Sequence, residues 1–331
     1  MKVLGDKIPK LAVIIPNYNG QDFLGQCLDS LSRQSFRDFE VIMVDNGSSD
    51  QSIALAERHP LKPRVIRLQR NLGFSAAVNA GMNAASAQLI ALLNNDAEAD
   101  SKWLETLLTC AKERPEMDFF AALVLKDKKR DQVESAGVGY NLQCRPFPIF
   151  AGLPRSRPQK AEIFLASGAA VLFKKTLVQK IGQFDPAYFA YLEDVDFFLR
   201  ARLAGCRGML CPDAVVYHRA AATELGDRAS AKRMDSSQRV FLISRNRWRL
   251  VWDNLPAGMI VLLWPLICLG WLRGLAYHLF QSGQPAPFLA GSAAGFFSLP
   301  RRLEKPRGNK TRAMKNSELL RWMRKAVREL K

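Results

Sequence analysis

The first half of the chain alternates short apolar runs with segments of helical periodicity. The apolar runs are bounded by turn or polar residues, as buried strands are, and cover residues 11–15, 40–44, 65–68 and 89–93. The helical segments lie between them, at residues 22–33, 50–58 and 75–87. This alternation predicts an α/β fold with a doubly wound, mostly parallel sheet. Sheets of that kind bind ligands beyond the carboxyl ends of their strands.

The size and composition of the chain predict one large domain with an appendage. Its 331 residues are 48% hydrophobic, which is ample for a sizeable core and excludes disorder as the default. The six cysteines form no C-x-x-C pair, as expected of reduced thiols in the cytoplasm, and no signal peptide is visible. We expect an α/β domain over residues 8–225, a membrane-associating helical region over 226–300 and a basic tail over 301–331.

Polar residues follow the four predicted strands, where a ligand would bind. They are Asn17, Asp45, Asn71 and Asp96. Asp45 alone proves little, because an Asp followed by Asn-Gly-Ser-Ser-Asp also forms a turn and a helix N-cap. The Asn71-Leu72-Gly73 segment is equally consistent with a simple turn.

The motifs around these positions resemble the nucleotide-sugar half of family 2 glycosyltransferases, which have the GT-A fold. The match covers about residues 10–220 and is most similar to the rhamnosyltransferase-like branch, which has Asn-Asn-Asp where others have Asp-x-Asp. Each motif alone is weak, but their order and spacing together are specific. The matching segments are Val13 to Gly20, Val44 to Asp50, Asn71 to Phe74 and Leu93 to Ala97.

The resemblance assigns a set of residues to the donor nucleotide. Pro16, Asn17 and Tyr18 would form a wall against the base, and Asp45 would accept hydrogen bonds from the pyrimidine or ribose. Asn71 and Gly73 would let the backbone approach the nucleotide, and Asn95 is assigned to the same site.

Asp96 is the predicted ligand of a divalent metal, Mg²⁺ or Mn²⁺, bound to the donor diphosphate. A cation that bridges two phosphates keeps waters and needs only one or two carboxylates. The alternative is that Asp96 caps the helix near Ser101. By the resemblance His218 would be a second ligand, although Ala221-Ala222-Thr223 replaces the expected glycine and serine, and a lone His at a strand end is also consistent with a surface residue.

The segment Glu193-Asp194-Val195-Asp196 resembles the family's E-D-x-D-x-x-x-R motif, in which the second acid deprotonates the acceptor hydroxyl. Asp194 is therefore the predicted general base of a displacement that inverts the anomeric carbon. On a helix, Asp196 and Arg200 lie four residues apart and can pair, which leaves Glu193 to support the helix start. The alternative is that Glu193 and Asp194 only stabilise a helix N-terminus.

The acceptor would lie over Ser167 and Gly168, by the same resemblance, although close packing of two strands would give a similar run of small residues. Residues 126–160 combine a charged run with spaced prolines and predict a mobile or irregular excursion over this site. Arg247-Trp248 lacks the glutamine that precedes it in processive family members, which favours one sugar added per encounter.

The net charge of +17 is concentrated at the C-terminal end. Residues 301–331 hold twelve Lys and Arg against three Asp and Glu, a net charge of +9. Such a tail could bind nucleic acid, but uncharged apolar stretches at residues 255–272 and 286–299 favour an anionic membrane surface and no nucleic acid. We expect in-plane or re-entrant helices at the cytoplasmic face of the membrane; the alternative is a buried helical hairpin of a soluble domain.

Together these features predict transfer of a sugar, with rhamnose among those the resemblance implies, from a nucleotide-diphosphate donor to a lipid-linked or polysaccharide acceptor in cell-surface glycan synthesis. Two alternatives differ in class. A nucleotidyltransferase would need a glycine- and Lys/Arg-rich phosphate loop near residue 16. A catalytically silent protein that recruits partners to membranes would have lost Asp96 or Asp194, and both are present.

Overall fold

The computed structural model describes residues 10–219, 236–299 and 312–328. The four predicted N-terminal strands are present, and they are parallel neighbours. They are β1 (Leu11–Asn17), β2 (Phe39–Asp45), β3 (Arg64–Arg67) and β4 (Leu89–Leu93), in the spatial order β4-β1-β2-β3. Leu11 of β1 pairs with Phe39 on one side and Leu89 on the other, so these strands end at one edge.

The rest of the sheet continues beyond β4 and mixes strand directions. One strand, β11 (Ala170–Lys174), runs antiparallel between β4 and β6 (Phe119–Lys126), and β12 (Gly208–His218) is parallel to β6. Shorter antiparallel strands complete it at the side of β12 and β6: β5 (Ala97–Ala99), β7 (Lys129–Ser135) and β10 (Ala161–Ile163). The predicted mostly parallel α/β sheet is confirmed.

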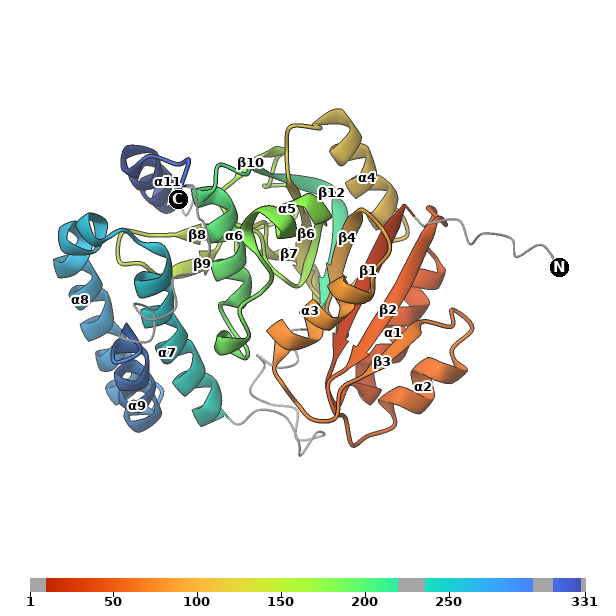
Figure 1. The fold of residues 1–331 in the computed structure, drawn as a ribbon, viewed down its shortest axis with the longest axis horizontal. Coiled ribbons are helices and arrows are strands. Elements are labelled where there is room, and N and C mark those ends of the chain that lie inside the picture. The colour runs from red at the N-terminus through yellow and green to blue at the C-terminus, as the bar shows by residue number, and fades with distance from the viewer. Residues whose placement is uncertain (1–9, 220–235, 300–311, 329–331) are drawn as a thin grey trace.

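Helices cover both faces of the sheet because successive strand residues point to opposite sides. In β1, Ile14 joins a core with α3 (Phe74–Ala84) and α6 (Glu193–Leu203), whereas Val13 joins a core with α1 (Gln21–Ser32) and α4 (Trp103–Glu113). Figure 1 shows this layered arrangement. The remaining short helices of the domain are α2 (Ser52–Arg58), α5 (Lys175–Ile181) and the 3-10 turn η1 (Pro186–Tyr188).

The segment predicted as a mobile or irregular excursion, residues 126–160, contains short strands joined by turns and irregular stretches. Besides β7, it forms an antiparallel hairpin of β8 (Val138–Tyr140) and β9 (Pro146–Pro148). Val133 and Tyr140 are fully buried and anchor these strands in the core. The spaced prolines are compatible with these short edge strands, because the missing N–H groups need no ladder partner there.

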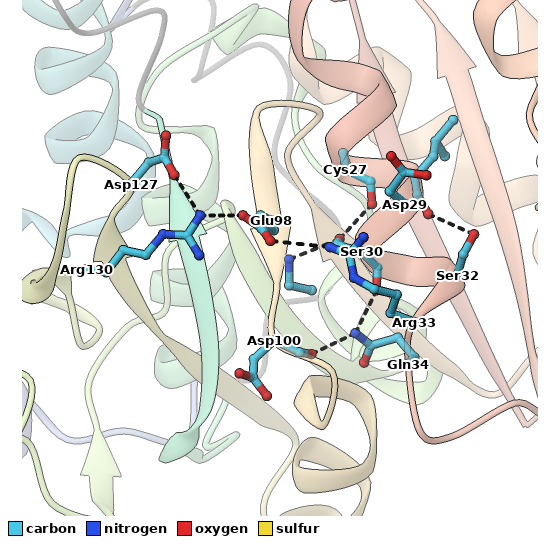
Figure 2. Close-up of polar contacts among 12 residues, drawn as sticks. Cys27, Asp29, Ser30, Ser32, Arg33, Gln34, Glu98, Asp100, Asp127 and Arg130 are labelled. Atoms are coloured by element: carbon cyan, nitrogen blue, oxygen red, sulfur yellow. Dashed lines mark hydrogen bonds and ion pairs between the residues drawn. The ribbon is translucent and has the colours of Figure 1, made fainter.

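A polar network surrounds Glu98 of β5. Arg33, the residue that follows α1, and Arg130 of β7 both contact its carboxylate, at 3.3 and 2.5 Å, and Arg130 also pairs with Asp127 (Figure 2). The Gln34 amide donates to the carbonyl of Asp100 at 2.7 Å. These contacts fix the short strand that begins directly after Asp96.

The C-terminal region packs beside α6 as helices α7 (Ser236–Asn254), α8 (Ala257–Phe280) and α9 (Pro285–Phe296), as Figure 1 shows. The predicted apolar stretches become α8 and α9, although α8 continues past Arg273. Its side chains Val261 and Phe280 are 75% and 85% exposed. Among the described helices, α8 has the length and apolar composition to cross a membrane, a property that core helices of soluble proteins can share.

Part of the basic tail forms a helix, α11 (Asn316–Arg328), that packs on the α/β domain. Leu319 and Met323 are fully buried, and Trp322 stacks on Phe164 with ring centroids 5.6 Å apart. The apolar side of α11 is thus used within the chain, and residues 301–311 of the predicted tail lie outside the described residues.

Candidate active site

A cleft of about 350 Å³ lies at the carboxyl ends of β1 and β4. It gathers residues from both halves of the domain. The predicted site residues that line it are Pro16, Asn17, Tyr18, Asn71, Gly73, Asn95, Asp96, Ser167, Gly168, Glu193, Asp194 and His218. Asp45 and Arg200 do not line it.

Asp45 is buried behind the donor side of the cleft. Its Oδ1 accepts a hydrogen bond from the Asn17 amide at 3.1 Å, and Asn95 in turn donates to Asn17 at 2.8 Å. Its Oδ2 accepts from the backbone N–H groups of Gly47 and Ser48, which is the turn that the sequence alternative predicted. Asp45 therefore orients Asn17, while Asn17 itself faces the cleft.

Asn46 organises the second donor segment and was missed by the sequence analysis. Its amide donates to the Asn71 side chain at 3.0 Å and to the Gly73 carbonyl at 3.1 Å. Gly73 has a positive φ of 88°, and a Cβ atom there would lie 2.4 Å from the carbonyl oxygen of Phe189. Glycine is thus required for the approach of the 189 loop, and Gly73 also lines the cleft, so the predicted approach of a nucleotide stays a prediction.

The two predicted metal ligands come together because β12 pairs with β5. His218 lies opposite Ala97 in that register, next to Asp96. The His218 Nε2 atom is 3.1 Å from Asp96 Oδ1, and both side chains are only 10% exposed. The Asn94 amide nitrogen lies 3.2 Å from the same His218 atom.

Glu134 of β7 is a second partner of His218 that no sequence signal indicated. Its Oε1 lies 2.8 Å from His218 Nδ1, on the other side of the ring. Burial of the imidazole opposes its protonation, but the carboxylates of Asp96 and Glu134 outweigh it and raise the pKa of His218 to about 10. A carboxylate on Nδ1 is the arrangement that orients a metal-binding histidine and leaves Nε2 for the metal.

The donor set fits a divalent cation with few protein ligands. One carboxylate and one imidazole suit Mg²⁺ or Mn²⁺ when a diphosphate and waters supply the other positions. Within the described residues, no group of three or more His, Cys, Asp and Glu side chains could hold a metal, so Asp96 and His218 would act as a pair.

Asp194 lies at the first turn of α6 and faces the cleft floor. Its Oδ2 accepts a hydrogen bond from the backbone N–H of Gly168 at 2.8 Å, and its Oδ1 accepts from Val195 at 2.7 Å. Burial raises the pKa of Asp194, and these backbone hydrogen bonds counteract part of that rise. Burial, together with the neighbouring Asp194 charge, raises the pKa of Glu193 well above its usual range.

The predicted pairing of Asp196 with Arg200 is present, at 2.8 Å. Both side chains are buried, and Arg200 also donates to the carbonyls of Ile181 and Gln183. Arg200 therefore has a structural role one layer behind the cleft. Glu193 and Asp194 form no ion pair with a cation among the described residues, and both line the cleft.

The loop that leads into α6 has unusual backbone conformations. Phe189, Tyr191 and Leu192 all have positive φ, between 63° and 67°, although none is glycine. Asn246 on α7 holds this loop by donating to its carbonyl oxygens. The sequence drew attention to the Arg247-Trp248 pair next to Asn246, but not to Asn246 itself.

A larger cavity of about 1040 Å³ adjoins the cleft at Ser167, Asp194 and His218. Pro146 and Phe147 of the β8–β9 hairpin form part of its wall. Its lining is rich in cations: Lys126, Lys128, Lys129, Arg219 and Arg239.

The sequence matches known glycosyltransferases. Residues 12–182 match the family model for glycosyl transferase family 2. The chain is 30% identical over 226 residues to the uncharacterized glycosyltransferase YwdF of Bacillus subtilis, covering 67% of this chain and 78% of YwdF. It is 26% identical over 266 residues to an N-acetylglucosaminyl-diphospho-decaprenol L-rhamnosyltransferase of Mycobacterium tuberculosis, covering 72% and 86%. Other relatives match over a shorter part: only 30% of the length of EpsJ of Bacillus subtilis is covered.

The fold also matches solved structures. The N-terminal part of TarS from Staphylococcus aureus, residues 1–349, in complex with UDP-GlcNAc superposes with a TM-score of 0.59 at 18% identity, covering 97% of this chain and 88% of that one. At this identity the likeness concerns the fold, which is the predicted GT-A type. The family match over more than half of the chain, together with the YwdF relationship, shows that this chain belongs to glycosyltransferase family 2.

Proposed function

We propose that this chain transfers a sugar from a nucleotide-diphosphate donor to a hydroxyl of a lipid-linked or polysaccharide acceptor, with inversion at the anomeric carbon and dependence on a divalent metal. The observation that carries the proposal is the shared cleft, which the Asp96–His218 pair and Asp194 all line. The Mycobacterium relative, whose name describes transfer of L-rhamnose to a diphospho-decaprenol acceptor, supports rhamnose as the first donor sugar to test.

The donor would occupy the side of the cleft formed by Pro16, Asn17, Tyr18 and Asn71. Tyr18 is partly exposed at the cleft wall and offers its ring to a base. Asn17 is held in place by Asp45 and Asn95, so its orientation is set before the donor binds. The donor diphosphate would then reach the Asp96–His218 pair.

Asp96 and His218 would hold the divalent cation, and Glu134 would keep the imidazole oriented. When bound, such a cation neutralises charge on the departing diphosphate, so that no general acid is needed. The high pKa of His218 belongs to the pair without metal, and metal binding would release the proton.

Asp194 would take the proton of the acceptor hydroxyl. Its carboxylate is fixed by the Gly168 N–H, and burial raises its pKa toward the range that suits a base. The cavity beside it, with the β8–β9 hairpin and several cations, has room for an acceptor that carries negative charge. Ser167 lines both spaces, and Gly168 lines the cleft.

The exposed apolar side chains of α8 support association with the cytoplasmic face of a membrane, in a peripheral or re-entrant manner. A lipid-linked acceptor would be met at that surface.

The test is a panel of nucleotide-diphosphate sugars, including dTDP-rhamnose and UDP-GlcNAc, assayed for nucleotide-diphosphate release with Mn²⁺ and with Mn²⁺ removed by a chelator. Donor-dependent release that requires metal supports the proposal. A different result would indicate a nucleotidyltransferase. In that case the chain would be stabilised by a nucleoside triphosphate and would convert it together with a sugar phosphate, but would release no nucleotide diphosphate from any nucleotide sugar.

A further inference from the structure

Three arginine side chains and one histidine gather where the β8–β9 hairpin meets the C-terminal helices, away from the cleft. Arg145 precedes β9, Arg247 lies on α7, and Arg273 and His278 lie on α8. None of the four is used by the proposed reaction.

Contacts at Arg247 join the three segments. Arg247 lines a narrow interior cavity together with Cys144, the neighbour of Arg145 in the hairpin. Its Nη1 atom lies 3.7 Å from the position that a Cβ atom would take on Gly274, the residue after Arg273. The Phe288 ring from α9 also lies next to Gly274. It stacks on His278 of α8, with ring centroids 4.9 Å apart.

No carboxylate balances this charge among the described residues. The Nε atom of Arg247 is buried and has no hydrogen-bond partner in the described part of the chain. Burial and, to a smaller extent, the charge of Arg145 lower the pKa of Arg247 to about 10. Burial and the charge of Arg273 likewise lower the pKa of Arg145. The cations therefore repel one another, and only the weak acids Tyr140 and Cys144 act in the opposite direction on Arg247.

A buried guanidinium without a counter-charge is unfavourable, so this arrangement is suited to an anion from outside the chain. We propose that Arg145, Arg247 and Arg273 bind the phosphate of a membrane lipid headgroup. Guanidinium groups match phosphate oxygens in charge and in paired hydrogen-bond geometry. The exposed Leu269 and Leu272 of α8, one turn or less from Arg273, would lie along the lipid chains.

The choice of a lipid as the source of the phosphate rests on the proposed membrane association. The existence of an anion-binding site does not depend on it. The proposal also connects this site with the cavity proposed for the acceptor. The hairpin that carries Arg145 continues into Pro146 and Phe147, which line the acceptor-side cavity. A headgroup bound at this cluster would therefore fix the hairpin and hold the acceptor cavity next to the bilayer surface.

The test uses the full-length chain and flotation with vesicles of phosphatidylcholine, with or without one-fifth phosphatidic acid. Arg145→Gln combined with Arg273→Gln should weaken binding to the phosphatidic acid vesicles by about tenfold or more, the loss of roughly one charge-assisted contact. The matched control, Arg321→Gln combined with Arg324→Gln on α11, removes the same charge from an exposed helix surface. Equal losses in the two double variants, or no loss in either, would overturn the site.

A second variant separates geometry from charge. Arg247→Lys keeps the positive charge but cannot form the paired contacts, so it should also weaken binding to phosphatidic acid vesicles, and unchanged binding would contradict the assignment of Arg247. All variants are compared by circular dichroism and thermal unfolding, since Arg145 and Arg273 are not fully buried and should be replaced without loss of the fold.

Calorimetric titration with inorganic phosphate and pyrophosphate, without vesicles, identifies the source of the anion. Binding of these ions that is lost in the Arg145/Arg273 double variant supports the same site with a soluble ligand, whereas binding only to phosphatidic acid vesicles supports a lipid headgroup. Neither the flotation nor the calorimetric titration uses a nucleotide sugar, so both results remain valid if the chain proves not to transfer sugar. Conversely, if the enzyme is active but its phosphate and vesicle binding does not depend on these arginines, only this inference is rejected.

Discussion

The Nδ2 atom of Asn246 lies 2.7 Å from the carbonyl oxygen of Tyr191, three residues before the proposed base Asp194. The same amide is 3.0 Å from the Tyr188 carbonyl and 2.9 Å from the Ala190 carbonyl. Asn246 is fully buried on α7, a helix that belongs to the C-terminal region by sequence. The C-terminal region is thus joined to the catalytic domain at the loop that presents Asp194.

Replacement of Asn246 should disturb catalysis through that loop. In Asn246→Ala, the carbonyls of Ala190 and Tyr191 lose this donor, whereas the Tyr188 carbonyl still accepts from Arg245. We expect a loss of about 1–3 kcal/mol in the free energy of unfolding. Because the loop has positive φ values that need support, kcat should fall about tenfold while the affinity for the nucleotide, measured separately, changes little. The control Gln284→Ala removes the amide that contacts Ser236 at the other end of α7 and should leave kcat unchanged. Equal effects in both variants would show a general loss of stability.

The metal pair gives a second prediction. Asp96→Ala should abolish transfer and weaken binding of the nucleotide diphosphate in the presence of Mn²⁺, without unfolding the chain. His218→Ala should cost less, because water can replace one ligand. Turnover of Asp96→Ala near the wild-type rate with metal present would show that Asp96 only stabilises the strand end.

Glu134 should act on the metal through His218. Glu134→Gln keeps the size of the side chain but removes the charge that orients the imidazole, and such partners typically contribute about 10- to 100-fold in metal affinity. We expect a loss of that size in Mn²⁺ binding, measured by electron paramagnetic resonance without donor. The control Glu105→Gln changes a carboxylate that contacts Ser35 away from the cleft and should not alter the Mn²⁺ affinity.

Membrane association can be tested at the exposed face of α8. Val261→Glu and Leu262→Glu place charges on side chains that are exposed, so the fold should persist while binding to vesicles falls. Met259→Glu at the buried face of α8 is the contrasting variant and should destabilise the chain instead. Full membrane binding by Val261→Glu/Leu262→Glu would show that this face is not the membrane contact.

Much of the α/β half could be predicted, because periodicity and strand-end polar residues are local signals. The strands β1 to β4, the Asp196–Arg200 pair and the approach of Asp96 to His218 follow from such signals and from the family motifs. Glu134 and Asn246 could not be predicted in the same way. Their roles depend on the pairing of β7 with β6 and on the packing of α7 against the 188–192 loop, and neither contact has a sequence pattern. For Asp45, the expected turn is present, the contact with Asn17 had no sequence signal, and the expected contact with the nucleotide stays a prediction.

The last prediction concerns Asp194 and its neighbour Glu193, and it uses both pH and substitution. Asp194 must be deprotonated to act as a base, and burial raises its pKa, so turnover should fall as the pH decreases through that raised value. Asp194→Asn should lower kcat by about 100-fold or more and remove this acid limb, with donor affinity nearly unchanged. Glu193→Gln should reduce turnover less.

Glu193 also makes stability depend on pH. Because the pKa of Glu193 is raised in the folded chain, the folded chain binds this proton more tightly than the unfolded chain does. Wild-type stability is therefore lost as the pH rises through that raised value. Glu193→Gln should therefore stabilise the chain more at pH 8 than at pH 5 in thermal unfolding. If Glu193→Gln is inactive and Asp194→Asn is active, Glu193 is the base and Asp194 supports it. If both variants turn over normally, the two carboxylates have only a structural function.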